Sequence, residues 1–178
     1  GAPSIDFASN DADVVIQWAD DPTPGLVVEP LMESARYPVA SAALLDRVGV
    51  NTPEDLLNVR LMHDEVDDAW EEWFTNAGLP PPAMPRGPVF PNCELATTAA
   101  EQGQGVSLAY DAVVRNTIAS GRLVRLFDAV TMPIVIYSLT YPVGRANDPM
   151  IAEFREWIFG QAYGEGTVPA APVAIMQG

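Results

Sequence analysis

The sequence predicts an α/β fold with mostly parallel sheets. Short apolar runs of strand length alternate with segments of helical period, which is the pattern of βαβ units. The run from Val14 to Trp18 is rich in β-branched residues and lacks apolar–polar alternation, as expected of a strand covered on both faces. The 178 residues are 48% hydrophobic, enough for a buried core, and 17 prolines and 13 glycines divide them into short elements.

The first third of the chain is predicted to consist mainly of strands. These strands are expected at residues 4–7, 14–18, 26–31 and 35–41. A capping-box-like pattern then predicts the start of a helix. Thr52 fits the N-cap position, Pro53 fits the first helical position and Asp55 is the acidic member of the box.

The segment from Arg60 to Gly78 predicts an aromatic helix. Its apolar residues recur at the i, i+3, i+4, i+7 spacing of one helical face: Trp70, Trp73, Phe74 and Ala77. Asp67 or Asp68 fits the N-cap position, and Gly78 lies where a left-handed C-cap residue belongs. We therefore expect Trp70 and Trp73 to be largely buried on the face that they share with Phe74.

The second half of the chain continues the alternation. Further strands are expected at residues 89–90, 106–110 and 134–140, and further helices at residues 95–102, 111–120 and 149–160. Gly103 and Gly121 are the predicted stops of the first two helices, and Asp148 caps the third, which we expect Gly160 to end. The buried face of this last helix is predicted to carry Ile151, Phe154 and Ile158. Residues 162–178 lack periodicity and form the predicted tail.

The charge balance excludes several classes of partner. The chain carries 24 acidic residues against nine basic ones, all arginine, for a net charge of −15. Binding DNA or an anionic membrane requires clustered cations, which this sequence lacks.

The sequence also has no apolar run long enough to span a bilayer and no secretory signal at its start. The single Cys93 excludes an intramolecular disulfide and a cysteine-based metal site, which fits a reducing compartment.

The sequence also lacks a catalytic constellation. His63 is the only histidine, so any Ser-His-Asp triad or histidine-based zinc site would depend on it alone. No Gly-x-Ser-x-Gly motif is present, and Gly103-Gln104-Gly105 is not followed by the helix of a dinucleotide fingerprint. We therefore expect no catalytic residues, no metal site and no cofactor, and we expect His63 and Asp64 to hold the corner between a strand and a helix.

Several motifs occur in a characteristic order. Leu-Met-His-Asp is followed by Trp-x-x-Trp-Phe and Ala-Gly-Leu within residues 61–79, Thr-Pro-Glu-Asp-Leu-Leu lies at 52–57, and Gly-Arg-Leu-Val-Arg-Leu-Phe lies at 121–127. Together they resemble the effector-binding domains of LysR-type transcriptional regulators, in the glycine-cleavage-activator and β-lactamase-activator branch. The resemblance extends over about residues 11–161.

This resemblance implies a two-lobed fold like that of type II periplasmic binding proteins, with two hinge crossings. Lobe I would comprise residues 1–28 and 129–161, lobe II residues 29–126, and residues 162–178 would form the tail. The family's first strand and helix have no counterpart here, and neither does its N-terminal winged helix-turn-helix. We therefore expect a truncated domain with an incomplete lobe I.

The resemblance also implies the partners. A small-molecule effector would bind in the cleft between the lobes, and the full-length protein would form a homo-oligomer, either a dimer or a tetramer. DNA would be bound only through the missing N-terminal domain, in the cytoplasm and without a membrane. The alternative is a stand-alone periplasmic solute-binding protein with the same fold.

Candidate effector-binding residues are predicted at the ends of strands, because open α/β sheets bind ligands beyond the carboxyl ends of their strands. Ser41 and Ala42 follow one strand, and Asn92 and Cys93 open a helix after another. Asp64 and Tyr137 complete the predicted set. Hydroxyl, amide and helix-terminal N–H groups suit a polar or carboxylate-bearing metabolite, whereas Asp64 could instead select an amine. The sequence leaves both possibilities open.

Overall fold

The computed structural model describes residues 7, 12–18, 23–64, 69–81 and 87–163. The chain divides into two units, which it connects by two crossings. Unit 1 comprises residues 1–33 and 134–178, and unit 2 comprises residues 34–133. Both units combine strands with helices, so the predicted α/β class is confirmed.

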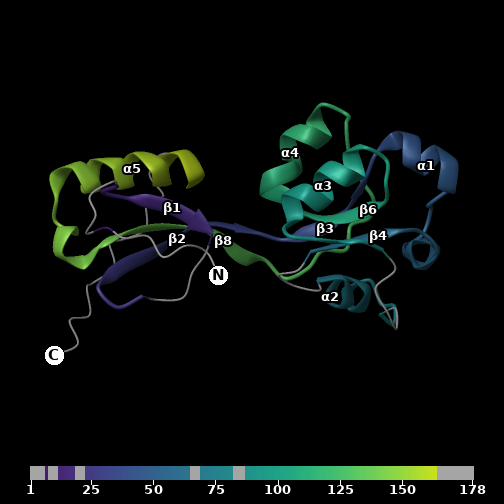
Figure 1. The fold of residues 1–178 in the computed structure, drawn as a ribbon, viewed down its shortest axis with the longest axis horizontal. Helices are drawn as coiled ribbons and strands as arrows, with labels where there is room; N and C mark the ends of the chain where they lie inside the picture. The colour runs from purple at the N-terminus through teal and green to yellow at the C-terminus, as the bar shows by residue number, and fades with distance from the viewer. Residues whose placement is uncertain (1–6, 8–11, 19–22, 65–68, 82–86, 164–178) are drawn as a thin grey trace. The chain divides into compact units, whose positions relative to one another are not determined.

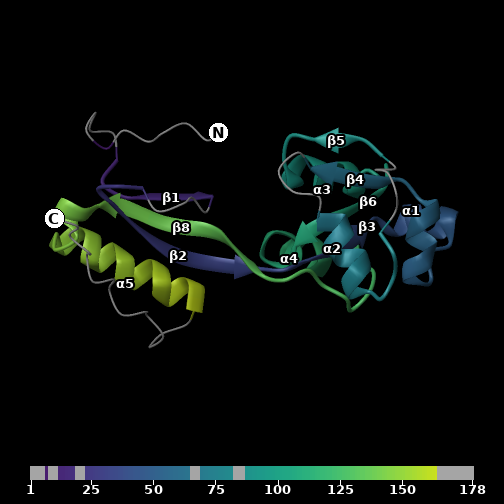
Figure 2. The same ribbon diagram turned by 90° about the horizontal axis from the view of Figure 1, so that it is seen from below.

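Unit 1 contains a three-stranded sheet with the order β1-β8-β2, and helix α5 packs against it (Figures 1 and 2). Its elements are β1 (Val15–Trp18), β2 (Leu26–Ser34), β8 (Ile134–Pro142), the 3-10 helix η3 (Val143–Arg145) and α5 (Pro149–Tyr163). The core between sheet and helix is made of Val27, Leu31, Leu139, Tyr141, Ile151 and Phe159.

The parallel arrangement expected for the strand at residues 14–18 is wrong. β1 pairs with β8 in the antiparallel direction, from Val15 opposite Thr140 to Trp18 opposite Tyr137. β1 is at the end of the sheet order, and its side chains alternate between half-buried and exposed. A short β-branched run is compatible with a strand at the end of a sheet as well as with a strand buried on both faces. Both kinds of strand favour side chains that fit a pleated surface.

Unit 2 contains a mixed five-stranded sheet with the order β5-β4-β6-β3-β7. β4 is parallel to β5 and β6, whereas β3 is antiparallel to β6 and β7. The strands are β3 (Arg36–Ala40), β4 (Leu61–Asp64), β5 (Val89–Phe90), β6 (Val106–Tyr110) and β7 (Val124–Arg125). The helices are α1 (Ala42–Val48), the 3-10 helix η2 (Pro53–Asn58), α2 (Ala69–Asn76), α3 (Cys93–Glu101) and α4 (Asp111–Ala119).

Helices cover both faces of the unit 2 sheet. Figure 1 shows α3 and α4 on one side of it and α2 on the other. The aromatic side chains of α2 pack on Leu61, Val106 and Leu108, while α3 packs on Met62. All five residues of β3 and of β6 are therefore buried, which explains why neither strand alternates between apolar and polar residues, although β3 begins with Arg36 and β6 contains Ser107.

Most local signals act as predicted. Trp70, Trp73 and Phe74 are buried, and Gly78 adopts a left-handed φ of 79° after the helix. Asp55 accepts the backbone N–H of Thr52 at 2.8 Å, although the segment that it caps is a 3-10 helix. The proposed caps Asp67 and Asp68, the strand at residues 4–7 except Phe7, and most of the tail lie outside the described residues.

The predicted end of the last helix at Gly160 is wrong, because α5 continues to Tyr163. A Cβ atom at Gly160 would meet no atom within 4 Å, so this glycine lies on an open side of the helix. Its buried face also differs in detail. Ile151 and Phe159 are buried, whereas Phe154 and Ile158 are half-buried.

Candidate functional site

The parallel part of the unit 2 sheet brings chemistry-bearing side chains to one edge. β4 and β6 run parallel, so Asp64 and Tyr110 at their carboxyl ends lie at the same edge. β5 is also parallel to β4, with Phe90 opposite Asp64, and Asn92 and Cys93 follow β5 after Pro91. The structure thus gathers Asp64, Asn92 and Cys93, three of the residues predicted from the sequence.

Asn92 and Cys93 form the start of helix α3. Asn92 is its N-cap, and the side-chain oxygen accepts the backbone N–H of Leu95 at 3.0 Å. Cys93 is half-buried in the first helical turn. Burial raises the pKa of its thiol, the charge of Asp64 raises this pKa further, and the charge of Arg36 acts in the opposite direction. The thiol is therefore held in its neutral form close to an ion pair.

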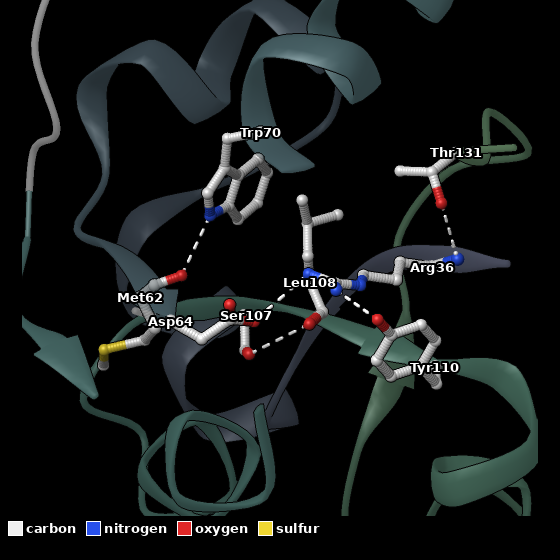
Figure 3. A network of polar contacts seen from close by, with 8 residues as sticks. All are labelled: Arg36, Met62, Asp64, Trp70, Ser107, Leu108, Tyr110 and Thr131. Carbon is white, nitrogen blue, oxygen red and sulfur yellow. Dashed lines mark hydrogen bonds and ion pairs between the residues drawn. The ribbon is translucent and has the colours of Figure 1, made fainter. Parts of the chain in front are cut away.

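Arg36 is the central residue of this edge, and the sequence did not reveal it. Its Nη1 donates to Asp64 Oδ2 at 3.1 Å, and its Nη2 donates to the Tyr110 hydroxyl (Figure 3). The guanidinium also lies over the Tyr110 ring, with its central carbon 4.2 Å from the ring centroid. The side chains of Arg36 and Asp64 are only 5% and 7% exposed. The result is a buried, neutralised pair of opposite charges.

Arg36 reaches this edge because β3 is antiparallel to β6. The residue that begins β3 lies opposite the residue that ends β6, so Arg36 faces Tyr110. Burial raises the pKa of the Tyr110 phenol, while the Arg36 charge limits that rise. The tyrosine therefore stays neutral at physiological pH and serves as both hydrogen-bond acceptor and stacking surface for Arg36.

Ser41 and Ala42 lie at the opposite edge of the same sheet. They follow the carboxyl end of β3, which the antiparallel pairing places beside the start of β6. Ser41 is buried, and within the described part of the chain its Oγ has no hydrogen-bond partner. Ala42 is exposed as the first residue of α1. The structure therefore does not bring these two residues together with Asp64.

Tyr137 belongs to unit 1, where it lies on β8 opposite Trp18 of β1. The two rings make an edge-to-face contact with centroids 5.8 Å apart. The tyrosine is half-buried.

His63 is buried in β4, and its backbone N–H donates to the Pro88 carbonyl at 3.0 Å. Among the described residues, no group of three or more His, Cys, Asp or Glu side chains is arranged to hold a metal ion. No helix in the described ranges has the length and apolar character needed to cross a membrane.

Comparisons with known proteins identify relatives of this chain. Residues 5–162 match the family model of the LysR substrate binding domain. The glycine cleavage system transcriptional activator of Escherichia coli (strain K12) is 34% identical over 161 residues, which cover 90% of this chain and 53% of that protein. The transcriptional activator AmpR of Rhodobacter capsulatus is 29% identical over 158 residues, covering 89% of this chain and 53% of the relative.

Solved structures agree with the sequence comparisons. The effector domain of AmpR from Pseudomonas aeruginosa matches with a TM-score of 0.75 and 28% identity, over 89% of this chain and 76% of that one. The AmpR effector-binding domain of Citrobacter freundii has the same fold, with a TM-score of 0.74, 24% identity and coverage of 89% and 78%. This chain spans about half the length of the curated relatives that it matches.

Proposed function

The chain belongs to the LysR substrate-binding domain family and is a regulatory effector-binding domain; on this premise we propose that it senses a small molecule for a longer transcriptional regulator. The curated relatives are named as transcriptional activators, which supports this role over that of a stand-alone solute-binding protein and over that of an enzyme. The full-length protein would work in the cytoplasm as a dimer or tetramer, and it would bind DNA through an N-terminal domain outside this sequence.

The proposed effector site is the edge of the unit 2 sheet at Asp64, Asn92 and Cys93. One observation carries this choice: parallel pairing gathers the carboxyl ends of β4, β5 and β6 beside the start of α3. Ligands of α/β sheets bind at such ends, where helix N-terminal N–H groups attract polar and anionic atoms. The predicted roles of Tyr137, Ser41 and Ala42, and the predicted location between lobes, stay predictions.

The ion pair at this edge bears on the chemistry of the effector. Asp64 is already neutralised by Arg36 at 3.1 Å, and both side chains are buried. An amine would have to displace Arg36 to use this carboxylate, leaving a buried guanidinium without its counter-charge. We therefore propose a neutral polar or carboxylate-bearing effector, bound by the N–H groups of the first turn of α3.

Chemical modification of Cys93 tests the site. The sequence has one cysteine and no lysine, so Cys93 is the main target of N-ethylmaleimide, and intact mass with peptide mapping distinguishes its adduct from one at the N-terminal amine. The raised pKa of Cys93 calls for a mildly alkaline reaction, because the thiolate is the nucleophile. A thermal-shift screen of polar and carboxylate metabolites first finds a ligand, and calorimetry then compares labelled and unlabelled protein. We expect labelling to abolish binding.

Two controls make the result specific. A Cys93→Ser variant treated with the same reagent should bind as the untreated Cys93→Ser variant does. Ala42→Tyr adds bulk at the opposite edge of the sheet and should leave binding unchanged. Full binding by the labelled protein would rule out the proposed edge, and loss of binding in Ala42→Tyr would instead favour the edge at Ser41.

A further inference from the structure

The segment that leads out of unit 2 is held by hydrogen bonds at four consecutive residues. Within unit 2, Ala129 and Val130 offer their carbonyls to helix α2, and Met132 donates its N–H to Glu72 Oε1 of the same helix at 2.6 Å. Thr131, between them, bonds to Arg36 of β3 instead. We call residues 129–132 the return segment. Its hydrogen bonds go to two partners: Arg36, which also bonds to Asp64 at the proposed effector edge, and helix α2, which also bonds to the Met62 carbonyl of β4.

The first connection runs through Arg36. Its backbone N–H donates to Thr131 Oγ1 at 2.9 Å, and its carbonyl accepts the Thr131 N–H at 3.0 Å. The side chain of the same residue bonds to Asp64 and Tyr110 at the ends of β4 and β6 (Figure 3). A single residue thus holds the return segment with its backbone and the effector edge with its guanidinium.

The second connection runs through helix α2. Trp70 Nε1 donates to the carbonyl of Met62, two residues before Asp64, at 2.9 Å. Trp73 Nε1, one turn later, donates to the Ala129 carbonyl at 2.9 Å, and Asn76 Nδ2, in the next turn, donates to the Val130 carbonyl at 2.9 Å. The Trp70 and Trp73 rings touch edge to face, with centroids 5.9 Å apart. Helix α2 therefore makes a continuous set of packed contacts and hydrogen bonds from β4 to the return segment.

We propose that Arg36 and helix α2 form a two-armed strut that couples the end of β4 to the return segment. A change in the surroundings of Asp64 would thereby alter the hydrogen bonding of residues 129–132, from which the chain leaves unit 2. This role rests on the proposed function for its biological meaning, since an effector at the Asp64 edge would be what drives the change. Arg36 is a positioning residue in this scheme and does not itself contact the effector.

Residue-resolved amide exchange on the whole 178-residue chain tests the strut without any effector. The N–H groups of Arg36, Thr131 and Met132 are direct reporters, because each one makes a described hydrogen bond of the strut. Asp64→Asn removes one charge of the ion pair. We expect the exchange of the Arg36 and Thr131 amides to rise by about fivefold or more, the usual lower range of coupling between sites. The matched control is Asp46→Asn on the exposed face of α1, which should leave these amides unchanged.

The second arm has its own variant. Trp70→Phe keeps an aromatic ring but removes the bond to the Met62 carbonyl, and it should speed exchange at Met132. The control is Trp157→Phe on the exposed side of α5. In a joint strut, the double variant Asp64→Asn/Trp70→Phe accelerates exchange by more than the product of the two single effects.

General destabilisation would raise exchange everywhere, so the amide of Ala100, which is buried in helix α3 in a different core cluster from Trp70, serves as the reference. Acceleration confined to the reporters supports the strut; equal acceleration at Ala100, or no change at Thr131 in Asp64→Asn, overturns it. If Asp64→Asn does not fold, Tyr110→Phe removes the other partner of the guanidinium and gives the same comparison. Since no effector is needed, a failed metabolite screen would reject the proposed ligand role while leaving this result standing.

Discussion

Arg155 of helix α5 donates hydrogen bonds to both carboxylate oxygens of Glu29 on strand β2. Its Nε lies 2.9 and 2.8 Å from the two oxygens, and its Nη2 lies 2.6 Å from one of them. Tyr141 of β8 donates its hydroxyl to the same carboxylate at 2.7 Å. The two charged side chains are 11% and 6% exposed. One ion pair therefore ties two strands and the helix of unit 1 together.

Breaking this pair should destabilise the protein strongly. Arg155→Met leaves the Glu29 carboxylate buried without its counter-charge, and we expect a loss of about 3–5 kcal/mol in the free energy of unfolding. Replacing both residues by Met should recover most of that loss, because an apolar pair leaves no buried charge behind. Urea unfolding of the single and double variants measures the difference. A single variant as stable as the parent would show that the pair is solvated.

Trp70 and Trp73 should contribute comparably to the stability of unit 2. They are 3% and 0% exposed, and each one also donates a hydrogen bond from its indole N–H. Truncation of either to Ala should cost about 3–5 kcal/mol, measured by urea unfolding. Trp157→Ala on the exposed side of α5 is the matched control, and it should cost much less. Equal losses at all three positions would contradict the burial of the α2 face.

Replacement of Gly105 and of Gly160 by Ala should change the stability of the protein in opposite directions. A Cβ at Gly105 would lie 2.5 Å from the Arg60 carbonyl oxygen, so Gly105→Ala should destabilise by about 1–3 kcal/mol. A Cβ at Gly160 would meet nothing within 4 Å, and this residue is inside α5. Gly160→Ala should therefore stabilise by about 0.5–1 kcal/mol, because alanine costs less backbone entropy in a helix. Thermal unfolding distinguishes the two; a destabilising Gly160→Ala would mean that the helix ends before this position.

Alkaline pH should weaken the fold through two tyrosines. Burial, assisted by hydrogen bonds to Asp111 and Glu29, raises the pKa of Tyr37 and Tyr141 to about 12, above the ordinary value of 10.0. The stability that these raised pKa values contribute is fully present below pH 10, where both the folded and the unfolded protein keep the phenol protons. It is lost as the pH rises towards 12, because the unfolded chain releases its protons first. Ultraviolet titration of the phenolates, compared with Tyr37→Phe and Tyr141→Phe, checks this. Ionisation of either tyrosine near pH 10 in the folded protein would be the contrary result.

This domain alone should not bind DNA specifically. Its net charge of −15 opposes approach to a polyanion, and the sequence contains no basic cluster to release counterions. A gel-shift titration at low salt, with a sequence-matched and a scrambled duplex, should show no selective retention. Selective retention of the matched duplex would require a recognition surface that the charge pattern does not predict.

The sequence predicted the elements well because their signals are local. Helix periodicity, the helix start at Asn92 and the Gly78 stop depend on neighbouring residues only, and each appears where it was expected. Strand direction is a long-range property. An apolar run fits a covered strand of either direction, which is why β1 was expected to be parallel and is not.

The same distinction applies to the candidate site. Asp64, Asn92 and Cys93 lie together because their strands are parallel, as assumed from the sequence, while their role in binding stays a prediction. Ser41 and Ala42 are separated from them because β3 runs the other way. Arg36 was overlooked because an arginine at the start of a strand carries no sequence signal of burial; only the pairing with β6 reveals its surroundings.

Arg36 is buried and Arg155 is half-buried, so trypsin cleavage after each one reports on local opening of its unit. The sequence has no lysine, so trypsin can cut only after its nine arginines. Cleavage after Arg36 requires β3 to leave the unit 2 sheet, and cleavage after Arg155 requires α5 to unwind in unit 1. Under native conditions, proteolysis follows the population of such locally opened states. The order in which these two peptides appear in a timed digest therefore tells which unit opens more readily, without any label or mutation.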